Sequence, residues 1–478
     1  MTAFLISLAI LIGGYFTYGW IVDRIMGTRK EAPVPALTMT DGVDYLPLPA
    51  WKVFLIQFLN IAGLGPIFGA IMGIMFGPAA FLWIALGTIF AGGVHDYLSG
   101  LISVREGGVS LPEIIGSNLG RNVKSLSMVF SVVLLILVGT VFIITPAGLL
   151  AGMTSVSFDR TFWVLVILAY YLLATLLPID KLIGNFYPVF GFALLFMAAG
   201  LLGVLLFGGV DIPVSFSQLA AYDSSAAVFP MMFVSIACGA ISGFHATQSP
   251  MMARCLKSER LARPVFYGAM VAEGIVALIW AAAAVAFTGG YDALHDYMAA
   301  SGNSAGSLVT DISKGWLGAF GGVLALLGVI AAPITTGDTA LRSARLMIAD
   351  FFRIDQKKIW KRIAITAPIF VAVFFIMMID FQVLWRYFAW SNQTLAVFTL
   401  WAVTVYLARR RLSYLISMLP ALFMTVVSAT YLLYAPRPEG FGLGLTTALS
   451  SGIALALIFT FLFLRYGLPK RHTANQPL

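Results

Sequence analysis

The sequence predicts an all-α integral membrane protein with about 13 transmembrane helices, ten of which form two inverted repeats of five helices. Three observations lead to this fold class: the low content of charged residues, the distribution of Lys and Arg along the chain, and two helix interruptions at matching positions. Of the 478 residues, 60% are hydrophobic and 10% are charged. Soluble domains carry about 25% charged residues, so this chain has too few charges to cover a water-exposed surface.

Long apolar segments give the positions of the helices. A transmembrane helix needs about 20 mostly apolar residues to cross the hydrocarbon core, and it satisfies its backbone groups internally. No basic residue precedes the first apolar segment, which favours a retained helix over a signal peptide. The predicted spans are 3–22, 50–76, 78–104, 125–151, 161–179, 184–208, 228–250, 264–288, 316–349, 363–380, 384–408, 412–434 and 446–465.

The Lys and Arg residues predict the orientation. With the N-terminus outside and the C-terminus inside, all but four of the 29 basic residues fall in inner loops or at inner helix ends. The four outer ones are Arg160, Lys314, Arg386 and Arg437. Basic residues are enriched in cytoplasmic loops, so we expect a multi-pass protein of the bacterial cytoplasmic (inner) membrane. The net charge of +8 then faces anionic lipid, and the sequence predicts no nucleic-acid partner.

Two spans are interrupted by glycine-rich segments, Ile61–Pro66 and Gly239–His245. Such breaks are tolerated at membrane depth where protein or a water-filled cavity satisfies the freed backbone groups. Close helix packing through small residues is the simpler explanation of each break alone. Each break, however, lies in the first helix of a group of five spans, and an odd number of spans inverts the second group. This is the LeuT-type plan of transporters, with the binding site at the bilayer midplane.

The repeats divide the chain into four parts. The first part is an N-terminal helix with a cytoplasmic loop, and the last contains two additional helices with a cytoplasmic tail. Between them lie the two five-helix repeats. The predicted boundaries are 1–49, 50–208, 209–408 and 409–478.

Polar residues inside spans are costly and are therefore candidates for function. His245 follows a break directly, and we favour a functional role for it. Asp338 and Arg342 stand four residues apart on one helical face, so a structural ion pair is an equal alternative. Glu273 is also a candidate for function, and the alternative is that it forms a hydrogen bond between helices. The adjacent His95 and Asp96 are expected to anchor their helix without facing each other.

The coupling ion has two candidates, Na⁺ and H⁺. Thr335 and Thr336 lie on the eighth core helix, which approaches the first core helix in this plan, and their hydroxyls together with carbonyls around Ile61 to Leu64 suit a sodium ion. Hydroxyls that bond back to their own helix are the alternative. Proton coupling through Asp338, His245 or Lys181 is the rival. No other cofactor is predicted.

Several motifs together resemble the carbon-starvation protein A family. They span residues 41–393 in the family's order, and this resemblance implies a carrier for pyruvate or peptides in the cytoplasmic membrane. The chain has Gln57-Phe58 where many relatives carry His-Phe. The motifs are Asp41-Gly42-Val43-Asp44-Tyr45-Leu46-Pro47, Ile61-Ala62-Gly63-Leu64-Gly65-Pro66, Ser242-Gly243-Phe244-His245-Ala246, Thr336-Gly337-Asp338-Thr339-Ala340-Leu341-Arg342-Ser343-Ala344-Arg345 and Asn392-Gln393.

We therefore predict a secondary active transporter that imports a small carboxylate, with pyruvate slightly preferred if Arg342 neutralises Asp338. A peptide transporter of the same family is the first alternative and a channel the second; the four histidines and two cysteines offer no convincing enzyme site. The expected partners are a small-molecule substrate and the lipid bilayer. The expected ion-coupling residues are Ile61, Leu64, Thr335, Thr336 and Asp338. The expected substrate-binding residues are Gly63, Leu64, Gly65, Ser242, Gly243, His245, Asn392 and Gln393.

Overall fold

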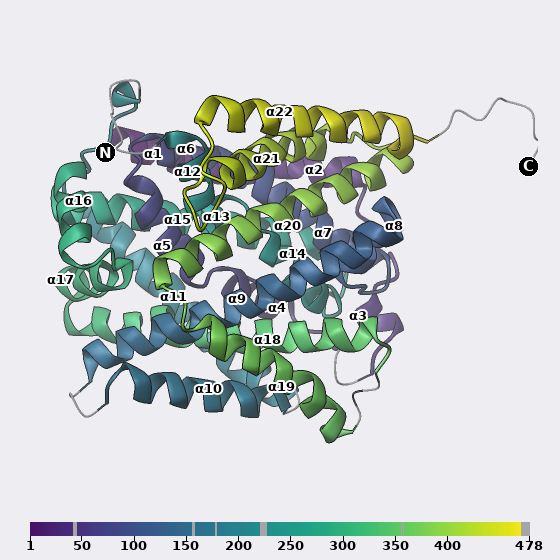
Figure 1. The fold of residues 1–478 in the computed structure, drawn as a ribbon, viewed down its shortest axis with the longest axis horizontal. Helices are drawn as coiled ribbons and strands as arrows, with labels where there is room; N and C mark the ends of the chain where they lie inside the picture. The colour runs from purple at the N-terminus through teal and green to yellow at the C-terminus, as the bar shows by residue number, and fades with distance from the viewer. Residues whose placement is uncertain are drawn as a thin grey trace, which may run out of the picture.

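The computed structural model describes residues 1–41, 45–154, 158–176, 179–219, 227–354, 356 and 358–469, with no side-chain description for 175–188 and 326. All regular elements in these ranges are helices, and most of them run roughly along one common direction (Figure 1). The prediction of an all-α membrane protein is confirmed.

The first half of the chain contains the N-terminal helix and the first repeat. α1 and α2 together form one apolar helix. The short α3 lies in the segment between α2 and α4, and α8 lies in the segment between α7 and α9. The elements are α1 (Thr2–Phe16), α2 (Tyr18–Met26), α3 (Pro35–Thr38), α4 (Ala50–Ile61), α5 (Leu64–Ile74), α6 (Ala79–Gly87), the π-helical η1 (Thr88–Gly92), α7 (Gly93–Arg105), α8 (Leu111–Leu119), α9 (Arg121–Met153), α10 (Arg160–Leu176) and α11 (Ile179–Phe207).

The second half contains the second repeat and the two additional helices. Its elements are η2 (Phe216–Gln218), α12 (Val228–Ser235), α13 (Ala237–Ala240), α14 (Gly243–Ala253), η3 (Glu259–Leu261), η4 (Arg263–Tyr267), α15 (Gly268–Thr288), α16 (Tyr291–Ala300), α17 (Ala305–Ala325), η5 (Leu326–Ala331), α18 (Ala332–Phe351), α19 (Ile359–Ile376), α20 (Phe381–Arg409), α21 (Leu415–Tyr434), α22 (Leu445–Leu462) and η6 (Phe463–Gly467).

Every predicted span coincides with a helical segment in the described part of the chain. Eight helices there are long and apolar enough to cross a membrane, and two bent helix pairs bring this number to ten. The other three predicted spans correspond to the shorter α10, to the interrupted α12–α14 and to the more polar α20.

Both predicted interruptions are present. The first separates α4 from α5 at Ala62 and Gly63 and bends the span by 48°. The second span is broken twice, at Ile236 and again between α13 and α14, where Ile241 and Ser242 are extended. The positions of these breaks confirm the LeuT-type plan.

A further bend marks the start of the eighth core helix. Gly318 adopts φ 61° and ψ −151°, a left-handed backbone that favours glycine. Figure 1 shows α16 and α17 at the same end of the molecule, and Gly318 lies beside the predicted start of this span at residue 316.

Contacts between loops agree with the alternating topology. The N-terminal amine donates to the Ile212 carbonyl at 3.0 Å, and both lie on the predicted outer side. Arg105 binds Glu259 at 3.0 Å, and Arg409 donates to the Ser117 carbonyl at 3.0 Å. These four residues lie on the predicted inner side. Which side faces the cytoplasm stays a prediction.

Burial separates the core from the additional helices. In α9 and in the segment from η3 to α15, 78% of the most apolar window is buried inside the protein, against 22% in the segment α1–α2 and 22% in α22. Figure 1 places α21 and α22 together along one edge. The broken helices thus lie within a core that the outer helices flank.

Candidate substrate and ion site

The two broken helices meet at their interruptions. A Cβ atom built on Gly65 would lie 2.3 Å from the Cys238 Cβ, and one on Gly239 would lie 3.7 Å from the Pro66 Cα. The glycines therefore allow the backbone of one break to lie directly against the other. Leu64 and Ser242, predicted to bind substrate, are both fully buried here.

Side chains from α20 satisfy the backbone of the second break. The Asn392 carboxamide oxygen accepts hydrogen bonds from the Ser242 hydroxyl and from the Phe244 amide, both at 2.9 Å. The neighbouring Gln393 amide donates to the Phe233 carbonyl at 3.2 Å and to the Ile241 carbonyl at 3.4 Å. The predicted pair Asn392-Gln393 thus holds the break in place from the opposite helix.

Thr88 supplies a third contact, which the sequence did not reveal. Its hydroxyl, in the π-helical turn η1, donates to the Gly239 carbonyl at 3.1 Å. A single threonine in an apolar span carries no sequence signal, since most such hydroxyls bond back to their own helix.

Gly243 has a packing role in this structure. A Cβ atom built on it would lie 2.5 Å from the Ala396 nitrogen and 2.6 Å from the Asn392 carbonyl oxygen. These are backbone atoms of α20, which cannot turn away as a side chain does. Gly243 therefore allows α14 and α20 to approach closely beside the break.

Of the two threonines predicted to bind sodium, Thr336 lies at the first break. The Thr336 hydroxyl lies within hydrogen-bonding distance of the Leu59 carbonyl, 3.2 Å, and of the Ala332 carbonyl, 3.1 Å. A Cβ atom on Gly63 would lie 3.8 Å from the same hydroxyl oxygen. The Thr335 hydroxyl bonds back to Ala332 at 2.7 Å. Both hydroxyls thus bond back to their own helix, as the alternative expected, and a sodium site here stays a prediction.

Asp338 and Arg342 form the buried pair expected from their spacing. Their side chains approach to 3.8 Å, and Arg342 also donates to the Ala174 carbonyl at 2.5 Å. The side chain of Lys181, a candidate for proton coupling, lies outside the described residues.

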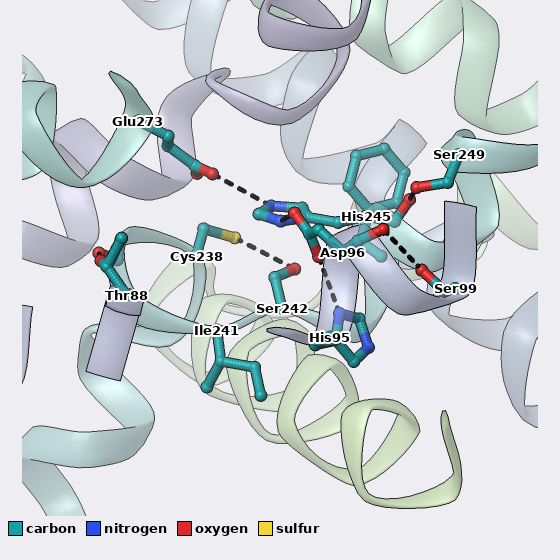
Figure 2. Close-up of polar contacts among 12 residues, drawn as sticks. Thr88, His95, Asp96, Ser99, Cys238, Ile241, Ser242, His245, Ser249 and Glu273 are labelled. Carbon is teal, nitrogen blue, oxygen red and sulfur yellow. Dashed lines mark hydrogen bonds and ion pairs between the residues drawn. The ribbon is translucent and has the colours of Figure 1, made fainter. Parts of the chain in front are cut away.

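His245 lies in a cluster of four titratable side chains (Figure 2). Its Nδ1 is 2.9 Å from an Asp96 carboxylate oxygen, and its Nε2 is 3.5 Å from a Glu273 carboxylate oxygen. The other Asp96 oxygen is 2.7 Å from Nδ1 of His95. All four side chains are fully buried, and α7, α14 and α15 supply them.

The expectation that His95 and Asp96 do not face each other is wrong. The spacing rule describes the directions of Cβ atoms, whereas the imidazole Nδ1 lies close to its own backbone and is within reach of a short neighbouring carboxylate. Both residues are therefore part of the cluster and not merely anchors at the end of a helix.

A cavity of about 260 Å³ lies on the predicted outer side of the breaks. Arg386 of α20 contributes to its wall and binds Glu439 at 2.8 Å. Burial raises the pKa of Glu439, and the Arg386 guanidinium opposes this. Both broken helices, α16 and α20 contribute to the rest of the wall, with Met72, Met231, Ser235, His295, Gln382 and Trp385 among its residues.

Two solved structures that share this fold are transporters. The chain aligns with the manganese transporter of Eremococcus coleocola at 11% identity and a TM-score of 0.55, covering 90% of this chain and 98% of that one. It aligns with MhsT, solved in complex with L-phenylalanine, at 14% identity and a TM-score of 0.54, covering 87% and 98%. At this identity the likeness concerns the fold alone, which is that of the LeuT-type transporters.

The chain belongs to the carbon starvation protein CstA family, because the sequence model of that family matches residues 1–155 and 150–318. The resemblance of its motifs to this family is thereby confirmed.

Relatives at several levels of identity support this assignment. An uncharacterized membrane protein of Haemophilus influenzae is 40% identical over 63% of this chain and 95% of that protein. The peptide transporter CstA of Campylobacter jejuni is 26% identical over 57% of this chain and 48% of its own length. The pyruvate/proton symporter BtsT of Escherichia coli is 25% identical over 57% and 47%. The matched part of this chain thus spans about half of each named transporter.

Proposed function

We propose that the protein is a cation-coupled secondary active transporter that imports a small carboxylate, pyruvate, across the cytoplasmic membrane. The observation that carries the choice of substrate is the pairing of the deep acids. Asp338 pairs with Arg342 at 3.8 Å and Glu273 with His245 at 3.5 Å. A peptide needs an acid for its amino group in addition to a site for its carboxylate, whereas pyruvate needs only the second.

The carboxylate site lies between the two breaks. α5 and α14 both begin there, after Gly63 and Ser242 respectively. The N-terminal end of a helix carries partial positive charge and amides without helical partners. Such half-helix ends bind anionic substrate groups in transporters of this plan. The substrate-binding set remains Gly63, Leu64, Gly65, Ser242, Gly243, His245, Asn392 and Gln393.

The uptake experiment uses proteoliposomes with labelled pyruvate or a labelled dipeptide, under separate sodium and proton gradients. We expect saturable, uphill pyruvate uptake and no dipeptide uptake. Uphill dipeptide uptake without pyruvate uptake would favour the peptide carriers of the family. Flux that does not saturate and never exceeds equilibrium would identify a channel.

The outer cavity is the proposed entry route, with Arg386 as the group that attracts the anion. Replacing Arg386 by Gln is expected to raise the KM for pyruvate about tenfold, because a guanidinium–carboxylate contact is lost. Arg386→Lys should raise it less, since the charge remains. Initial uptake rates against pyruvate concentration measure both effects.

Loss of the ion pair needs its own control, since Arg386→Gln leaves Glu439 without its cation. The double variant Arg386→Gln/Glu439→Gln removes both charges, and Glu439→Gln leaves the guanidinium free to attract substrate. We expect a raised KM in the double variant and no rise in Glu439→Gln. An unchanged KM in the double variant would exclude Arg386 from the entry route.

A further inference from the structure

The fully buried cluster around His245 has a pattern of close contacts that limits where its protons can reside. Each oxygen of Asp96 faces the Nδ1 atom of a different imidazole, at 2.7 and 2.9 Å. An ionised carboxylate only accepts hydrogen bonds. With Asp96 ionised, both imidazoles carry a proton on Nδ1, and Nε2 of His245 is left facing Glu273 (Figure 2).

The contact between His245 and Glu273 requires one further proton. A neutral imidazole with its proton on Nδ1 presents a lone pair at Nε2, and an ionised Glu273 presents only lone pairs. At 3.5 Å in a buried setting these groups repel each other. Either Glu273 is protonated or His245 is an imidazolium, so the pair holds one proton in this conformation.

Within the described residues, no hydrogen bond from another group compensates the charge of Glu273 in place of this proton, since neither of its oxygens makes one. The other titratable groups that act on the pair are His95 and Asp96 of α7 and the Cys238 thiol of α13. From α20, the neutral Asn392 side chain reaches this region by accepting a hydrogen bond from the Ser242 hydroxyl. Loss of the proton would leave two carboxylates, Asp96 and Glu273, on either side of one neutral ring.

We infer that the His245–Glu273 pair binds the coupling proton of the transport cycle. This inference rests on the proposed function, because it assigns the ion that accompanies the carboxylate. The proton enters from water on the outer side when the breaks open, resides between Nε2 and the Glu273 carboxylate, and returns to water on the inner side. No other bond forms or breaks.

Charge explains why proton and substrate bind together. His245 is the third residue of α14, directly after the break where the carboxylate is proposed to bind. A substrate anion beside an unprotonated pair would bring three negative charges into one buried region. The proton removes one of these charges, so each ligand favours the binding of the other.

The test compares two transport assays in proteoliposomes. Counterflow exchanges labelled for unlabelled pyruvate and needs no net proton movement, whereas uphill accumulation uses the proton gradient. Glu273→Gln keeps a neutral N–H donor opposite Nε2 but cannot release a proton. We expect counterflow within about twofold of the wild type and complete loss of proton-driven accumulation.

Two further variants sharpen this comparison. Glu273→Asp keeps a titrating carboxyl and should restore accumulation at a lower rate. Glu259→Gln makes the same chemical change at another buried glutamate, which pairs with Arg105, and should keep the wild-type ratio of protons to pyruvate. Proton-driven accumulation by Glu273→Gln would overturn the inference.

A measurement on the wild type keeps the inference testable if Glu273→Gln does not fold. Pyruvate entry should alkalinise the outer medium by about one proton per substrate molecule. Accumulation driven by sodium without proton movement would overturn the proton site and leave the proposed function intact. Absence of pyruvate counterflow in the wild type would instead overturn the proposed function.

Discussion

At the scale of single residues, Asn392 and His245 lie on either side of the second break and do different things. Asn392 gives one oxygen to two donors of the break, so its role is to hold the backbone. His245 places each ring nitrogen against a carboxylate, so its role is to hold protons. The sequence predicted both residues as substrate contacts, and that stays a prediction; it could not predict these bonds, because it shows which polar residues are deep but not which atoms they face.

Replacing Asn392 by Ala should destabilise the protein by about 2 kcal/mol, because the Ser242 hydroxyl and the Phe244 amide lose a buried acceptor. Thr399→Ala is the matched control on the same helix, since its buried hydroxyl bonds back to Leu395. Thermal unfolding in detergent measures both. Equal midpoints for the two variants would show that the break does not depend on Asn392.

At the scale of elements, the interruptions were predictable, but the hydrogen bonds that hold them were not. Glycines in matching helices located both breaks to within a few residues of Gly63 and Ser242. The partners are Thr88, Asn392 and Gln393, and they come from helices far away in sequence. Which distant hydroxyl or amide reaches a freed carbonyl depends on helix rotation and close packing, and a single sequence does not contain that information.

The two breaks should respond differently to added bulk. Gly243→Ala places a methyl group against backbone atoms of α20, at 2.5 and 2.6 Å, whereas Gly63→Ala meets the Phe142 ring at 3.1 Å. A ring can turn aside and a helix backbone cannot, so we expect Gly243→Ala to cost about 1–3 kcal/mol and to abolish transport. Gly63→Ala should keep folded protein.

Gly148→Ala in α9 serves as the control for these glycine variants, because its added methyl group meets no atom within 4 Å among the described residues apart from the nearby backbone of its own helix. The yield of monodisperse protein and the pyruvate uptake rate provide the two readouts. Wild-type uptake by Gly243→Ala would mean that α14 and α20 separate more easily than their contact indicates.

At the scale of the whole molecule, composition predicted the membrane fold, and the basic residues predicted which loops lie on the same side of the membrane. The contacts of Met1 with Ile212 and of Arg105 with Glu259 join loops that the alternation places together. The buried pairing of Asp96 with Glu273 through His245 required the full packing of three helices, because its members are separated by up to 177 positions in the sequence.

Orientation is testable with introduced cysteines, because both natural ones, Cys238 and Cys255, are buried. Ser307→Cys, exposed on the predicted outer side, should react with a membrane-impermeant maleimide in intact cells. Lys358→Cys, exposed on the predicted inner side, should react only after the membrane is permeabilised. The reverse labelling pattern would invert the predicted topology.

The bond between Asn392 and the second break also has a consequence for how the protein is made. Its two partners are 150 residues apart in sequence, so the ribosome completes the broken helix long before it synthesises the side chain that satisfies it. Until then, the polar backbone at Ser242 meets the bilayer or the insertion machinery without its native partner. Biogenesis therefore has a late step, in which the arrival of α20 converts an exposed gap in a nascent helix into part of a closed core.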